Sequence, residues 1–161
     1  MASPEYIDYL KTINNTFYDQ IKAADQKAAY ILTFLFVLLI WSSDMRQVFF
    51  WVNVEKGLTM RWVLSLLQVI ALGVALISAI LVLLPRDAHG GVALYWNAWP
   101  NAREVVARAM QSNDKEFLVE QYLSNIVSLS SICRKKYRTV AWAFQGLIVA
   151  LVCHVATLIV A

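Results

Sequence analysis

The chain has 161 residues, of which 60% are hydrophobic and 16% charged, and its mean hydropathy is +0.56. This composition excludes an ordinary soluble domain, because the core of a 161-residue domain could not bury so many apolar side chains. The net charge of +3 and the sequence pI near 8.9 would also fit a protein that binds nucleic acid. The cations are instead distributed as expected for a membrane protein, so we expect no nucleic-acid polymer as a partner.

An amphipathic helix is predicted at the N-terminus, over residues 1–27. Ser3, Pro4 and Glu5 form a helix-start pattern of a cap, a proline at the first helical position and an acid in the first turn. Apolar residues then recur at steps of three and four: Leu10, Ile13, Phe17, Ile21, Ala24 and Ala28. We expect a nearly continuous helix over residues 3–43, whose apolar stripe packs on the protein's own helices or on another copy.

Three uncharged segments predict three membrane spans. They cover residues 28–43, 62–84 and 139–161, and are 16, 23 and 23 residues long. At about 1.5 Å per residue, the two longer segments reach roughly 35 Å as helices, enough to cross a hydrocarbon layer of about 30 Å. The first reaches only about 24 Å and needs residues beyond it. The expected spans are therefore near 28–50, 62–84 and 139–161.

Small residues recur along the second span at a regular spacing. Ala71, Ala75 and Ala79 are four residues apart, so they line one ridge of the helix, where another helix could approach closely. The ridge predicts a packing interface, either within the chain or between copies. Pro85 ends this span, because proline disfavours helix in the residue before it.

Residues 85–138 predict a helical cytosolic module. Asn101 and Glu104 have the spacing of a capping box, which indicates a short helix to about residue 111, and residues 112–114 break it. Helical spacing then continues from residue 114 to residue 161, through Phe117, Leu118, Tyr122, Ile126, Leu129, Cys133 and Tyr137. The whole chain is thus expected to be an all-α membrane protein.

The positive charges predict the orientation in the membrane. The N-terminal segment and residues 85–138 carry 11 lysines and arginines, against 3 in residues 44–61. Because the cytoplasmic side carries the excess of cations, we expect a cytoplasmic N-terminus and a C-terminus on the outer side.

Sequence motifs of catalysis and metal binding are absent. No Gly-rich phosphate loop, G-x-S-x-G or H-E-x-x-H is present, so we expect no enzyme and no cofactor. Cys133 and Cys153 lie about 30 Å apart along one predicted helix and cannot pair within the chain. No spacing of cysteine and histidine resembles a metal site. His154, within the third span, is expected to be neutral and bonded to a neighbouring helix.

Basic and aromatic residues gather at the expected cytosolic side of the spans. Asp25 and Arg86 should lie at similar depth, which makes an ion pair or a shared ligand possible. Four cations in residues 134–138 fit a positive-inside flank or a contact with anionic lipid. Together with aromatic rings, they also fit a small anionic nucleotide, which needs phosphate donors and a stacking surface. The candidate ligand-binding residues are Lys27, Arg86, Tyr95, Trp96, Arg134, Tyr137 and Arg138.

These motifs, in this order, resemble the membrane effectors of Pycsar antiphage systems over residues 10–161. The matching features are Asp25 to Ala28 before the first span, Pro85 and Arg86 after the second, Tyr95 and Trp96 in the module, and residues 134–138 before the third. Membrane effectors of cyclic-oligonucleotide defence systems share this general plan.

The resemblance implies a homo-oligomeric protein of the bacterial inner membrane that responds to cyclic UMP or cyclic CMP. Binding on the cytosolic side would then damage the lipid bilayer and stop growth of the infected cell. The alternatives left open by the residues themselves are a constitutive accessory subunit of a membrane complex and a small pore without nucleotide gating.

Overall fold

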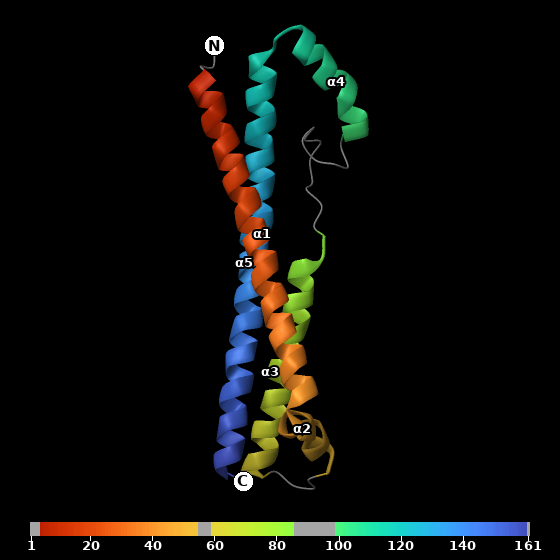
Figure 1. Cartoon of the computed structure of the whole chain (residues 1–161), viewed down its shortest axis with the longest axis vertical. Helices are drawn as coiled ribbons and strands as arrows, with labels where there is room; N and C mark the ends of the chain where they lie inside the picture. Colours follow the sequence, from red (N-terminus) through yellow and green to blue (C-terminus); the bar gives the residue numbers. More distant parts are fainter. Residues whose placement is uncertain (1–3, 55–58, 86–98, 161) are drawn as a thin grey trace. The chain divides into compact units, whose positions relative to one another are not determined.

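The computed structural model describes residues 4–54, 59–85 and 99–160, and these ranges contain helices and no strand (Figure 1). The helices are α1 (Pro4–Trp41), α2 (Ser43–Val54), α3 (Met60–Leu83), α4 (Trp99–Gln111) and α5 (Lys115–Val160). The predicted all-α fold is therefore confirmed. Because α1, α3 and α5 are each long and apolar enough to cross a membrane, the chain is a multi-pass membrane protein.

Two compact units divide the chain. The first unit takes residues 1–23 and 85–135, and the second, here called the membrane unit, takes residues 24–84 and 136–161. Helices α1 and α5 contribute to both units. The sequence places the corresponding boundaries at residues 27, 84 and 138.

The helix that carries the first span ends at Trp41, within two residues of the predicted end at residue 43. Ser42 separates α1 from α2, and its hydroxyl oxygen accepts a hydrogen bond from the Met45 backbone N–H at 3.2 Å. This contact caps the start of α2. The expected span over residues 28–50 is therefore divided between two helices. The part of α1 that belongs to the membrane unit, residues 24–41, is about 27 Å long by itself.

The other helix ends follow local sequence signals. Thr59 caps α3 by accepting a hydrogen bond from the Trp62 N–H at 3.2 Å, and Leu84 is extended ahead of Pro85. Asn113 adopts a left-handed φ of 51° between α4 and α5. The Asp114 carboxylate then caps α5 by accepting from the N–H groups of residues 116 and 117.

Helices α1, α3 and α5 pack together in the membrane unit. The Ala71, Ala75 and Ala79 ridge of α3 is buried there, against Leu35 of α1 and a set of small residues on α5. A Cβ atom added at Gly146 of α5 would lie 2.9 Å from both the Ala71 carbonyl oxygen and the Ala75 nitrogen. The ridge is thus filled by a helix of the same chain and is not available on the surface of the monomer.

A polar pair lies in the seam between α1 and α5 of the first unit. Asn125 Nδ2 donates to Asn14 Oδ1 at 2.5 Å, and both side chains are buried. The expected apolar stripes place Ile13 and Ile126 here, but these neighbours are only half-buried. A buried amide pair holds two helices in one register, because a shift would leave both amides without a partner.

Candidate functional site

The polar end of the membrane unit contains a buried lysine. Lys136 Nζ lies 2.5 Å from Asp25 Oδ1, and the exposed fractions of the two side chains are 7% and 36%. The carboxylate balances the lysine charge, which would be costly to bury alone. The contact also joins α1 to α5. These helices run parallel in this unit: Ile31 and Leu35, which follow Asp25 on α1, pack beside Ala143 and Leu147, which follow Lys136 on α5.

A cation and an aromatic ring lie beside this pair. The Lys27 ammonium group is 5.2 Å from the centre of the Tyr137 ring, within the range of a cation–π contact. The ring itself packs against Val82 and Val140, so residues of α3 and α5 hold it in place. Lys27 and Arg138 are exposed. The site therefore offers an exposed cation, Lys27, next to a positioned ring, and Arg138 follows that ring in the sequence.

The structure brings together only part of the predicted ligand set. Lys27, Tyr137 and Arg138 belong to the membrane unit. Arg134 is exposed on the stretch of α5 that belongs to the first unit. Arg86, Tyr95 and Trp96 lie outside the described residues. Asp25, which the sequence places near Arg86, pairs with Lys136.

Lys136 is the residue that sequence reasoning missed. Lys136 belongs to the basic run of residues 134–138, but its side chain is buried, whereas those of Arg134 and Arg138 are exposed. The available signal was its spacing: Lys136 lies three residues after Cys133 and four before Val140, which are both buried. Helical periodicity therefore places Lys136 on the inner face of α5.

A second polar contact lies among the membrane-spanning helices. Gln68 of α3 is fully buried, and its Nε2 atom lies 3.3 Å from His154 Nδ1 and 3.1 Å from Met45 Sδ. His154 thus meets a neighbouring helix, as expected from the sequence. The amide and the imidazole give each other a partner inside an apolar bundle.

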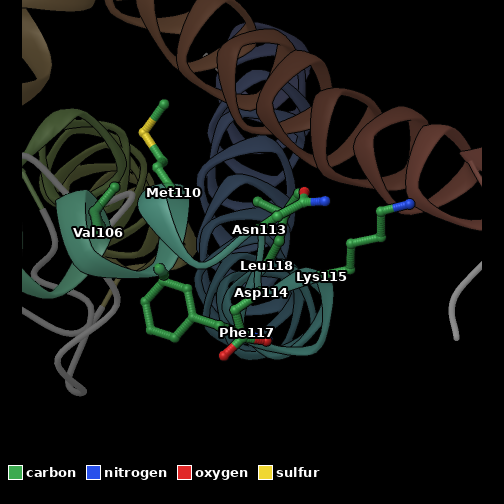
Figure 2. Close-up of a pocket in the computed structure, with 8 residues that line it drawn as sticks. Val106, Met110, Asn113, Asp114, Lys115, Phe117 and Leu118 are labelled. Carbon is green, nitrogen blue, oxygen red and sulfur yellow. The ribbon is translucent and has the colours of Figure 1, made fainter.

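A hollow of about 270 Å³ lies at the turn between α4 and α5 (Figure 2). Its lining combines apolar side chains such as Val106, Met110 and Phe117 with the polar turn. Figure 2 shows Lys115, a cation at this turn, extending away from Phe117. Of the predicted ligand residues that the structure describes, none lines the hollow, and its described lining has one cation, Lys115, rather than the pair that a phosphate group prefers.

Comparison with curated proteins and comparison with solved structures each gave no match. A comparison with protein families matched residues 9–161 to the Pycsar effector protein domain. This match covers all three apolar helices and both members of the Asp25–Lys136 pair. The chain therefore belongs to the Pycsar effector family, whose members act as effectors of antiphage defence.

Proposed function

We propose that this effector binds cyclic UMP or cyclic CMP on the cytosolic side and then impairs the bacterial inner membrane. The observation that carries the proposal is the contact of Lys27 with the Tyr137 ring beside the Asp25–Lys136 pair, with the exposed Arg138 next to Tyr137 in the sequence. A cyclic mononucleotide presents one negative charge and one flat base. Exposed cations beside an aromatic ring match both features.

The charge distribution in the cluster indicates which cations would take the phosphate. Lys136 is buried and balanced by Asp25, so it is a poor donor for an incoming anion. Lys27 is exposed beside the Tyr137 ring, so it is the first candidate for the phosphate. Arg138 is exposed on α5 next to Tyr137 in the sequence, and in our proposal it supplies a second positive charge. Arg134, and the three predicted residues outside the described ranges, Arg86, Tyr95 and Trp96, stay predictions from the sequence.

Gating requires a large difference in affinity between two states. Moving a population from 1:99 to 99:1 needs a ligand that prefers the active state by about 10⁴-fold, or about 5.5 kcal/mol. Charge-assisted hydrogen bonds from Lys27 and Arg138, together with one stacked base, can supply a preference of this size.

The proposed orientation has a cytoplasmic N-terminus and an outer C-terminus. The count of 11 cations against 3 supports the cytoplasmic N-terminus. The parallel course of α1 and α5 in the membrane unit supports chain ends on opposite sides, because two parallel spans must be joined by one that returns. A reporter fused after Ala161 should be periplasmic. A cytoplasmic reporter there would place the proposed site on the wrong side for a cytosolic nucleotide.

Binding is tested by calorimetry on the full chain in lipid nanodiscs, with cyclic UMP, cyclic CMP and cyclic AMP. We expect Lys27→Gln to weaken pyrimidine nucleotide binding about tenfold or more, since it removes a charge-assisted contact. Lys22→Gln, an exposed lysine of the first unit on the same helix, is the matched control and should bind normally. Equal affinities of the two variants would remove Lys27 from the site.

Membrane impairment is tested with the same proteins in liposomes that hold a potential-sensitive dye. The ligand should dissipate the potential for the unaltered chain and for Lys22→Gln, but much less for Lys27→Gln. If neither cyclic pyrimidine nucleotide binds or depolarises, the proposal is wrong and a constitutive accessory subunit becomes the better interpretation.

A further inference from the structure

One polar side chain of α5 faces outward from the membrane unit. Gln145 is exposed, and no hydrogen bond of its amide lies within the described part of the chain. It is seven residues beyond Arg138, or about 10 Å along the helix, and about 22 Å before the helix ends at Val160. The amide therefore projects into the hydrocarbon layer, where a polar group without a partner is costly.

Two other polar side chains of the membrane unit have a partner within the chain, and the unpartnered Ser65 Oγ and Gln68 Oε1 atoms are enclosed inside the bundle rather than facing outward. The exposed Thr33 hydroxyl donates to the Ala29 carbonyl oxygen at 2.9 Å, and Gln68 lies inside the bundle beside His154. Gln145 has neither arrangement. Since its own chain does not cover it, the partner of this amide has to come from another molecule in the membrane.

We propose that the exposed face of α5 around Gln145 binds α5 of a second copy of this chain, with the two Gln145 amides paired. All copies insert in the same direction, so a two-fold axis along the membrane normal brings the two glutamines to the same depth. A primary amide both donates and accepts, so two copies complement each other without any further residue. Interhelical amide contacts of this kind stabilise helix association in membranes.

The surface along the same face fits a helix as the occupant. From Gln145, exposed residues continue at steps of three and four through Ile148, Val152, Val155 and Ile159, and all four are β-branched. A shallow apolar groove of about 420 Å³ follows the same stretch. β-Branched side chains at this spacing fit the holes of a facing helix, and one polar residue in such a seam sets its register.

This interface differs from the alanine ridge expected from the sequence. Ala71, Ala75 and Ala79 already pack inside the chain, against Gly146. Lipid can cover the apolar residues of α5 at no cost, so these residues alone require no second copy. The unpaired amide of Gln145 is what distinguishes this face from an ordinary lipid-facing surface.

Cysteine crosslinking of the full chain in membranes, without nucleotide, tests the proposal. Val152→Cys lies on the face and should give a disulfide-linked dimer under mild oxidation. Leu158→Cys is the matched control: it is exposed on the same helix but points about 120° away from Val152, so it reports random collisions. The native Cys133 and Cys153 are buried, and the unaltered chain gives their background.

A second variant isolates the amide. Gln145→Leu keeps the side-chain volume, and we expect it to lower crosslinking through Val152→Cys about fivefold. Equal crosslinking at positions 158 and 152, or an unchanged yield with Gln145→Leu, would overturn the proposal and leave this face to lipid or to another protein. Because no nucleotide is added, either result leaves the proposed nucleotide sensing untouched.

Discussion

Adding one methyl group at Gly146 should destabilise the membrane unit. The new Cβ would lie 2.9 Å from backbone atoms of Ala71 and Ala75, so α3 and α5 would have to separate by about 0.5 Å to restore ordinary contact. Backbone atoms cannot rotate away, and a gap of this size forfeits about a quarter of the local dispersion energy. Overpacking of this kind costs about 1–3 kcal/mol, against a gain of about 1 kcal/mol from replacing glycine by alanine in a helix.

Gly73→Ala is the matched control, because Gly73 also lies within a membrane-spanning helix but has no atom within 4 Å of its added Cβ. We expect Gly146→Ala to lower the free energy of unfolding by about 1 kcal/mol and Gly73→Ala to raise it by up to about 1 kcal/mol. Unfolding in mixed micelles of increasing SDS content, followed by circular dichroism, measures both. Equal changes in the two variants would refute the close approach of α3 and α5.

Three further predictions concern polar groups and the buried thiol. Asp25→Asn leaves the buried Lys136 charge without its carboxylate and should cost about 2 kcal/mol of unfolding free energy, between the values for exposed and buried pairs. Adding Lys136→Met should restore most of the lost stability, and strictly additive losses in the double variant would contradict the pairing. Asn14→Leu should destabilise the chain by about 1–3 kcal/mol, because it leaves Asn125 buried without a partner, whereas the double leucine variant should recover stability in the same unfolding assay. Burial raises the pKa of the Cys133 thiol, so less thiolate is present at any given pH. Alkylation of Cys133 by iodoacetamide should therefore stay slow until the pH exceeds the usual range of thiol pKa values. Labelling at pH 8 as fast as that of a free thiol would contradict the burial of Cys133.

The helices could be predicted from the sequence because their signals are local. Hydrophobic runs, the helix-start pattern at residues 3–5, the proline at position 85 and the break at residues 112–114 act within a few residues of the chain, and α1, α3 and α5 follow them closely. The exception is α2, a second helix within the span expected over residues 28–50. The uncharged run ends at residue 43, but only the Ser42 cap on the Met45 N–H shows that a new helix begins there.

The partners of the polar residues could not be predicted, because they lie far apart in the sequence. Asp25 and Lys136 are 111 residues apart, as are Asn14 and Asn125. Each pairing depends on the register between α1 and α5, and a shift of one residue would turn every side chain about 100° around the helix. Composition identifies such residues as polar and says nothing of the atom that each one meets.

The family resemblance could be stated from the order of the motifs, because that order is a property of the chain alone. Which face of a helix stays free is decided by what the other helices cover. The sequence predicts the alanine ridge of α3 as a contact between helices, and it does not show which side of α5 stays exposed. Packing against Gly146 uses the ridge within the chain and leaves Gln145 facing the lipid, because in a three-helix bundle each helix can bury only the side that its neighbours reach.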